Sequence, residues 1–167
     1  MWCNMEKEYL LILEKAKSRY NQTKKSMSIL SKRSIKSFDR ILQSIHAEVF
    51  ENIDCTKCAN CCRKLGPLFN ETDIEKMSSH CGLRRKDFVE KYLRMDEDGD
   101  HVFKSMPCPF ALEDNLCSVY EIRPRACREY PHTDEKNMQP KLARLAQNTL
   151  YCPAAYLISE KLIERCG

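Results

Sequence analysis

Cys55-Thr-Lys-Cys58-Ala-Asn-Cys61-Cys62 places four thiols within eight residues of a 167-residue chain. Thiolates are soft metal ligands, so this spacing directs several such ligands toward one small volume. Four further cysteines follow downstream, and they are Cys108, Cys117, Cys127 and Cys152. Eight thiols are enough for two metal sites with four thiolate ligands each. This number predicts a metal-binding protein.

The chain contains eleven cysteines in total, which in a secreted protein would suggest disulfide bonds. Its first twenty residues hold only a short apolar run, from Tyr9 to Leu13, and do not resemble a secretory signal. No stretch approaches the roughly 20 apolar residues of a membrane span. We therefore expect a cytoplasmic protein without membrane association. In a reducing compartment, clustered cysteines are more often metal ligands than disulfides.

The formal net charge of +4 counts every cysteine as neutral. Four thiolates around Zn²⁺ or around a [4Fe–4S]²⁺ core carry about −2 per site, so two occupied sites would bring the net charge close to zero. Basic residues are concentrated in region 15–40, which could contact nucleic acid. A solvated surface is the favoured interpretation, because no aromatic side chains are interleaved there for base stacking.

The hydrophobic pattern predicts a mainly α fold with a small β-hairpin, in one compact helical domain organised around cysteine-ligated metal. Helices are expected over 5–20 and 26–51, separated by a turn at Asn21-Gln-Thr. These two helices form an N-terminal amphipathic hairpin over 1–50. Residues 51–167 form the cysteine-cluster domain, and both parts are expected to build one structural unit.

Shorter elements are expected downstream of the thiol run. Thr72-Asp-Ile-Glu75 has the pattern of a helix capping box. Extended segments at 101–106 and 116–120 predict the β-hairpin, with the reversal at Glu113-Asp-Asn115. Helices are expected over 73–80, 85–94, 123–128, 141–151 and 153–165.

The spacing of the thiols leaves the metal open between an iron–sulfur cluster and zinc. Three evenly spaced cysteines followed by distant Cys-Pro pairs are typical of bacterial-type [4Fe–4S] ligation. Structural zinc sites usually combine two separate C-x2-C pairs, and only the first run provides them here. Cys62 follows Cys61 directly, and adjacent cysteines do not easily bind one ion. We therefore expect each site to combine thiols of the run with downstream thiols.

Three arginines lie among the downstream thiols, and they are Arg123, Arg125 and Arg128. They either balance thiolate charge and tune a redox site, or form surface salt bridges with neighbouring glutamates. The remaining histidines and cysteines are expected to be spectators, because eight thiols already complete two sites. These are His46, His80, His101, His132, Cys3, Cys81 and Cys166. No motif for a nucleophile, a general base or a phosphate loop is present, so enzymatic activity stays undecided.

The cysteine spacing, together with Cys108-Pro-Phe and Tyr120-Glu-Ile-Arg123-Pro, resembles the CxxCxxCC (YkgJ-type) cysteine-cluster family, a zinc- or iron-chelating domain. The resemblance covers about residues 50–155 and says nothing of the first 50. The metal ligands that it implies are Cys55, Cys58, Cys61, Cys62, Cys108, Cys117, Cys127 and Cys152. The same signature is similar to part of the flagellin lysine methylases, where it accompanies an iron–sulfur cluster. No S-adenosylmethionine site is recognisable here, so methylase activity is a weak extension.

The leading hypothesis is an iron–sulfur protein that binds one or two clusters of the 4Fe–4S type through eight cysteines. Such a protein would serve electron transfer or a redox-dependent modification of an unknown protein or redox partner. The alternative is a non-enzymatic zinc-binding module with four-thiolate sites, which presents the basic hairpin to a partner. A third possibility is metal storage or delivery from labile sites.

Overall fold

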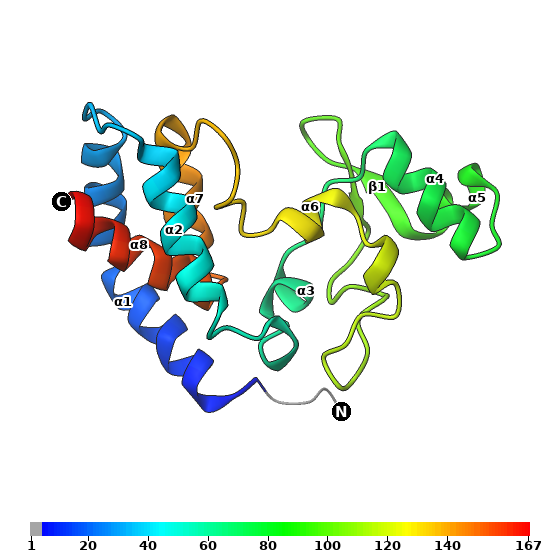
Figure 1. Cartoon of the computed structure of the whole chain (residues 1–167). Helices are drawn as coiled ribbons and strands as arrows, with labels where there is room; N and C mark the ends of the chain where they lie inside the picture. Colours follow the sequence, from blue (N-terminus) through cyan, green and yellow to red (C-terminus); the bar gives the residue numbers. More distant parts are fainter. Residues whose placement is uncertain (1–4) are drawn as a thin grey trace. The chain divides into compact units, whose positions relative to one another are not determined.

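Helices account for most of the regular structure in the computed structural model, which describes residues 5–167 (Figure 1). Between these residues the chain forms eight α-helices and one small antiparallel sheet of two strands. The prediction of a mainly α fold with a small β-hairpin is therefore confirmed. Cys3, expected to be a spectator, lies outside the described residues. None of the helices in residues 5–167 is long and apolar enough to cross a membrane.

The chain divides into two compact units. Residues 5–58 and 131–167 form the first, which we call the helical unit. Residues 59–130 form the second within the described chain, which we call the cysteine-rich unit.

Four helices build the helical unit, and they are α1 (Lys7–Leu30), α2 (Phe38–Phe50), α7 (Leu142–Asn148) and α8 (Pro153–Cys166). Helix α1 packs against α7 and α8, and α2 packs against α8 (Figure 1). Leu42, Ile45, Ile158 and Leu162 are fully buried in the core that these contacts form. Two 3₁₀ turns complete the unit, η1 (Cys55–Lys57) and η3 (Gln139–Lys141).

The turn expected at Asn21-Gln-Thr is wrong, because α1 continues through it to Leu30. Thr23 lies in the middle of the helix and is buried, so tertiary packing overrides the weak helix propensity of these polar residues. The chain reverses instead after Leu30. Ser37, directly before α2, adopts the left-handed conformation with φ 55°.

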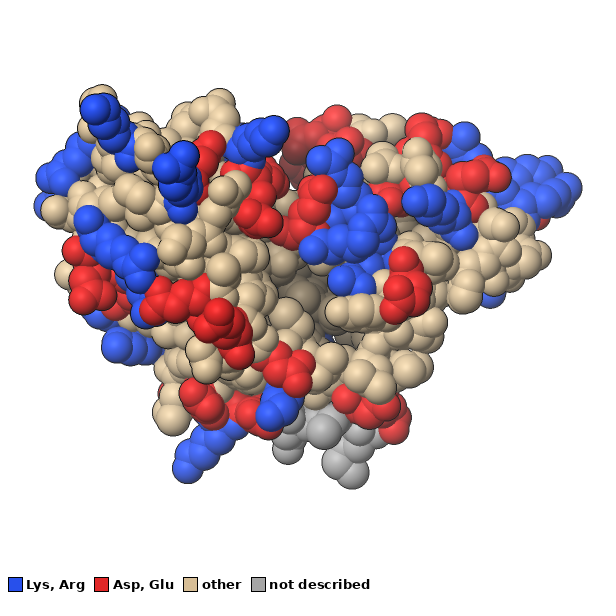
Figure 2. All heavy atoms as spheres, in the orientation of Figure 1, with Lys and Arg blue, Asp and Glu red and all other residues tan. Residues whose placement is uncertain are grey.

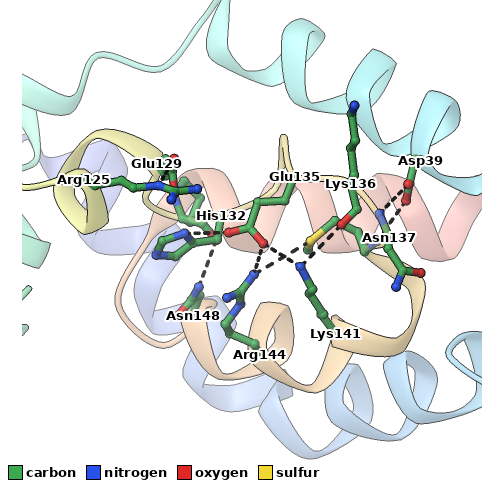
Figure 3. Close-up of polar contacts among 12 residues, drawn as sticks. Asp39, Arg125, Glu129, His132, Glu135, Lys136, Asn137, Lys141, Arg144 and Asn148 are labelled. Carbon is green, nitrogen blue, oxygen red and sulfur yellow. Dashed lines mark hydrogen bonds and ion pairs between the residues drawn. The ribbon is translucent and has the colours of Figure 1, made fainter. Parts of the chain in front are cut away.

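Acidic side chains fix the loop before α7 (Figure 3). Glu135 accepts from Lys141 at 2.9 Å and from Arg144 at 2.7 Å, and it lies 2.9 Å from His132 Nδ1. Burial alone would raise the pKa of Glu135. The hydrogen bonds and positive charges of Lys141 and Arg144 outweigh this effect and lower its pKa to about 2. Asp39, at the start of α2, accepts two backbone N–H bonds from the same loop.

Charged residues of both signs alternate over the visible face of the molecule (Figure 2). Arg19 of the basic N-terminal region pairs with Glu160 at 2.5 Å. Glu48 of α2 pairs with Lys161 at 2.6 Å and with Arg165 at 2.5 Å. Part of the basic charge is thus neutralised within the helical unit, and nucleic-acid binding by this region stays a prediction.

The cysteine-rich unit contains the shorter elements. They are α3 (Asn60–Lys64), α4 (Glu71–His80), α5 (Arg85–Tyr92), β1 (Leu93–Met95), β2 (His101–Phe103), η2 (Tyr120–Ile122) and α6 (Arg125–Glu129). An aromatic cluster forms the core, in which the rings of Phe69 and Phe103 meet edge to face at 4.8 Å between centroids. Phe88 is fully buried beside them. Such ring pairs add to the free energy that burial of apolar area supplies.

The β-hairpin lies elsewhere than predicted. Strand β2 pairs with β1, with Leu93 opposite Phe103. The predicted partner, 116–120, contributes a single isolated bridge between Ala111 and Cys117. The Asp96–Asp100 turn explains the difference, because Asp96 Oδ1 accepts from the N–H of both Asp98 and Asp100 and so connects two short strands directly.

The capping box of α4 is formed by Asn70 and Asp73, not by the predicted Thr72 and Glu75. Asn70 Oδ1 accepts from the N–H of Asp73 at 2.8 Å, and Asp73 Oδ2 accepts from the N–H of Asn70 at 3.4 Å. The second oxygen of Asp73, Oδ1, accepts from the N–H of Arg125 at 3.1 Å. Asp73 is only 2% exposed, so this carboxylate joins the starts of α4 and α6 in a site protected from water.

We expect Asp73→Ala to lower the free energy of unfolding by about 2–3 kcal/mol, because two backbone N–H groups lose a charged acceptor and α4 loses half of its cap. Asp87→Ala is the matched control, since Asp87 lies in the first turn of α5 and pairs with Arg84 at the surface. Its expected cost is below about 1 kcal/mol. Chemical denaturation of both variants measures the difference, and equal costs would contradict this role of Asp73.

The lowered pKa of Glu135 predicts an acid-dependent contribution to stability. A carboxyl group with a folded pKa near 2 and an ordinary unfolded value stabilises the fold above the unfolded value, and this contribution is lost as the pH falls toward 2. Glu135→Gln should therefore cost about 1 kcal/mol at pH 7, since its partners are partly exposed, and progressively less below pH 4.5. Denaturation across pH 2–7 tests this, with exposed Glu164→Gln as control. A cost that does not change with pH would refute it.

Candidate metal centre

The thiol run is divided between the two units of the chain. Cys55 and Cys58 belong to the helical unit, where Cys55 begins the η1 turn and Cys58 follows its end. Cys61 and Cys62 belong to the cysteine-rich unit, on the short helix α3. Ala59, the residue directly before α3, adopts the left-handed conformation with φ 48°.

In the cysteine-rich unit, backbone contacts bring downstream cysteines to α3. The N–H of Cys108 donates to the carbonyl of Cys62 at 2.8 Å. Cys117 lies opposite Ala111 in the isolated bridge, so the loop that contains Cys108 turns back on itself. Cys127 lies on α6, and its N–H donates to the carbonyl of Pro124 at 2.9 Å. We call these cysteines the four-thiol group: Cys62, Cys108, Cys117 and Cys127.

Electrostatic interactions connect the four thiols of this group. Although much of the Cys127 residue is exposed, loss of hydration around its thiol and the charges of Cys62, Cys108 and Cys117 together raise its pKa to about 12, against the opposing charge of Arg123. Burial also raises the pKa of Cys108 to about 11, with the charges of Cys62 and Cys117 contributing. Together these thiols therefore disfavour ionisation unless a cation compensates them.

Backbone N–H groups are directed at the sulfur atoms. The N–H of Phe110 donates to the Cys108 thiol, and the N–H of Val119 donates to the Cys117 thiol. The N–H of Ala111 donates to the Cys108 carbonyl at 3.1 Å and also acts on the Cys108 thiol. Each of these bonds lowers the pKa of its thiol against the larger effect of burial. Hydrogen bonds from the backbone to sulfur orient and tune thiolate ligands in metal sites. These loops therefore hold Cys108 and Cys117 in an environment suited to the ionised form.

Cys62 differs from the other members of the group. Its Sγ lies 3.9 Å from the Sγ of Cys61. The hydrogen bond from Cys61 lowers the pKa of Cys62 to about 7, burial opposes this shift, and the positive charges of Arg63 and Arg123 favour it. Cys62 is thus the member of the four-thiol group that ionises most readily, and Cys61 is positioned as its direct neighbour.

The structure distinguishes the three downstream arginines. Arg125 forms the surface salt bridge with Glu129, at 2.6 Å. Arg128 donates to the carbonyl of Arg123 at 2.5 Å. The guanidinium of Arg123 lies 3.7 Å from the centroid of the Tyr120 ring and donates to the Tyr120 carbonyl at 2.7 Å. Its positive charge lowers the pKa of three thiols, and these are Cys62, Cys117 and Cys127.

Arg63 is a second cation near the thiols, and sequence reasoning missed it. It donates to the side-chain oxygen of Asn115, and its charge also lowers the pKa of Cys62. Asn115 is buried and has a left-handed φ of 69°. The adjacency of Arg63 to Cys62 in sequence was the available signal. The role of Asn115 could not be inferred, because it lies 52 residues away.

A second group of thiols lies in the helical unit. Burial, together with the charges of Cys55 and Cys58, raises the pKa of Cys152 to about 12, although the N–H groups of Ala155 and Ala154 oppose this shift. Cys152 is the residue before α8, so its sulfur receives N–H groups from the first turn of that helix. We call Cys55, Cys58 and Cys152 the three-thiol group.

The other potential ligands have different surroundings. His46 Nδ1 lies 2.8 Å from the hydroxyl oxygen of Thr133, and burial lowers the pKa of the imidazole. His132 contacts Glu135 at 2.9 Å. Cys81 packs against the aromatic core of the cysteine-rich unit, and Cys166 packs against the core of the helical unit. His132 also lies with Glu129 and Glu135 in a group whose ligand atoms are within 4.8 Å of one another, so the spectator role of these residues stays a prediction.

The donor set fits a soft metal ion or an iron–sulfur cluster. The ten cysteines within residues 5–167 are thiols, with no disulfide bond among them. All members of the four-thiol and three-thiol groups offer sulfur, and backbone N–H groups and arginine side chains supply the hydrogen bonds and positive charge that thiolates require. When bound, the metal would be held by these cysteines.

Comparison with family models confirms the resemblance to a cysteine-cluster family. The model CxxCxxCC, described as "Putative zinc- or iron-chelating domain", matches residues 54–153, which is more than half of the chain and contains both thiol groups. No curated protein and no solved structure matches this sequence. The chain therefore belongs to the CxxCxxCC family of zinc- or iron-chelating domains.

Proposed function

We propose that this chain is a cytoplasmic iron–sulfur protein that serves electron transfer or a redox-dependent modification of a partner protein. The observation that carries the proposal is the four-thiol group, whose members act on one another's pKa inside a single unit. Four cysteines are the usual ligand set of a [4Fe–4S] cluster. Cys61 adjoins this group, and the three-thiol group contributes to a second centre.

The separate origins of the four ligands differ from the usual pattern of a structural zinc site. Structural zinc sites usually draw their ligands from C-x2-C or C-x4-C pairs. No two members of the four-thiol group are so closely spaced, since eight residues lie even between Cys108 and Cys117. A cluster, when bound, accepts and donates single electrons, and hydrogen bonds and nearby charge set its potential. Arg123 would supply nearby positive charge, and the N–H groups of Phe110 and Val119 would supply hydrogen bonds to sulfur.

A zinc-binding module is the second candidate, and the three-thiol group favours it. Cys55 and Cys58 form a C-x2-C pair, which is typical of one half of a zinc site, and Cys152 adds a third thiol. In that case the metal would stabilise the helical unit by joining η1 to the start of α8, and the protein would act by presenting its surface to a partner.

Anaerobic purification should yield a brown protein whose visible absorption bleaches on reduction, with iron and acid-labile sulfide in comparable amounts. This result follows from thiolate-to-iron charge transfer in a cluster held by the four-thiol group. Elemental analysis and sulfide determination on the same sample measure it. A colourless protein that contains stoichiometric zinc would reject the iron–sulfur proposal and favour the zinc module.

Cys108→Ser should remove the metal of the four-thiol group, or weaken its binding at least 10- to 100-fold, because serine replaces a soft sulfur ligand. It should also lower the thermal midpoint, since metal binding contributes to folding free energy. Cys81→Ser is the matched control, because Cys81 packs against the same core but lies outside both groups. Equal metal content in the two variants would exclude Cys108 as a ligand.

A further inference from the structure

We infer that Tyr9, on helix α1, is a positioning residue for the thiols of Cys55 and Cys58. Tyr9 lies outside the segment that matches the family, residues 54–153. The inference deepens the proposed function and rests on it, because the three-thiol group is there proposed to bind metal. The structure connects Tyr9 to these thiols by a hydrogen bond and by packing.

The hydrogen bond fixes the residue that begins the η1 turn. The N–H of Asp54 donates to the hydroxyl oxygen of Tyr9 at 3.0 Å. Asp54 caps η1, since its Oδ1 accepts from the N–H of Thr56 at 2.9 Å and from the Thr56 hydroxyl at 2.6 Å. Tyr9 thus orients the capping residue, and the capping residue orients the three-residue turn that begins with Cys55.

Packing connects Tyr9 to the second thiol. Cys58 is 8% exposed and belongs to a small buried cluster with Met5, Tyr9 and Leu13. Ile53, two residues before Cys55, packs against the same cluster. The Tyr9 ring therefore helps to exclude water from Cys58, while its hydroxyl group holds the backbone that leads to Cys55.

The start of α1 makes further contacts with the same turn. The N–H of Glu6 donates to the carbonyl of Lys57 at 3.2 Å, and the Glu6 carboxylate lies 3.4 Å from the Lys57 ammonium group. Lys57 is the residue directly before Cys58. Contacts from α1 therefore reach both ends of the segment that carries the two thiols.

These contacts matter because η1 has little stability of its own. A 3₁₀ turn of three residues has few and poorly aligned hydrogen bonds, so its conformation depends on its surroundings. Ordering such a segment costs conformational entropy when a metal binds. Tyr9 and Glu6 reduce this cost by holding the turn before the metal arrives. The N-terminal helix is thereby part of the proposed centre, although it supplies no ligand.

Tyr9→Phe tests the inference, because it keeps the ring and removes only the hydroxyl oxygen. Tyr20→Phe is the matched control, since Tyr20 is also on α1 and its hydroxyl donates to Gln147 Oε1 at 2.7 Å, at the surface. The purified protein is labelled with limiting iodoacetamide, and mass spectrometry measures the labelling rate of each cysteine. In Tyr9→Phe the rates of Cys55 and Cys58 relative to that of Cys117 should rise roughly 2- to 10-fold. Tyr20→Phe should leave both ratios unchanged.

The metal is followed in the same variants with Cd²⁺ as a thiophilic probe and a chelator as competitor. Tyr9→Phe should release the metal of the three-thiol group about 10- to 100-fold more readily and leave that of the four-thiol group unchanged. Labelling ratios equal to those of Tyr20→Phe, or a uniform rise at every cysteine, would overturn the inference. If the wild-type chain binds no metal while Tyr9→Phe still accelerates labelling of Cys55 and Cys58, the proposed function fails and the positioning role stands.

Discussion

The accumulation of thiols in a small region with little hydration is the constraint on which the rest of the site depends. Burial raises the pKa of Cys108 to about 11, and each additional thiolate nearby makes ionisation still less favourable. Thiols in such a region ionise unfavourably by themselves. They become metal ligands when a cation compensates the negative charge of the thiolates. The N–H groups of Phe110 and Val119 and the guanidinium of Arg123 supply part of this compensation within the protein. The loops of the cysteine-rich unit therefore serve to position the sulfur atoms of its cysteines.

Much of the secondary structure could be predicted from sequence, because local patterns determine it. The helices near the C-terminus begin where proline and apolar periodicity place them, and α8 starts at Pro153 as expected. The predicted secondary structure is wrong where tertiary contacts determine the backbone conformation. Thr23 is polar and was expected to help form a turn, yet burial against neighbouring helices keeps it helical. The packing of α1 against α7 and α8 could not be predicted, because an amphipathic stripe does not specify its partner.

The candidate site was predictable in its residue types and less so in its grouping. Spacing and residue chemistry indicated the eight cysteines as candidate ligands and required thiols of the run to combine with downstream thiols. In the structure, the charges of Cys55 and Cys58 act on Cys152, whereas those of Cys62, Cys108 and Cys117 act on Cys127. The sequence does not determine this division. The hydrogen bonds of Arg63, Asn115 and Asp73 join segments that are distant in the sequence, and no local pattern predicts them.

Within residues 5–167, the chain enters the cysteine-rich unit after Cys58 and leaves it after Tyr130. This unit is therefore an insertion within the helical unit. During synthesis on the ribosome, the inserted segment emerges in full before α7 and α8 are made. Helices α1 and α2 cannot form their packing contacts with α7 and α8 until those helices have been synthesised. The apolar faces of α1 and α2 thus remain without these partners until α7 and α8 have been synthesised, and in this interval the nascent chain is most exposed to misassociation.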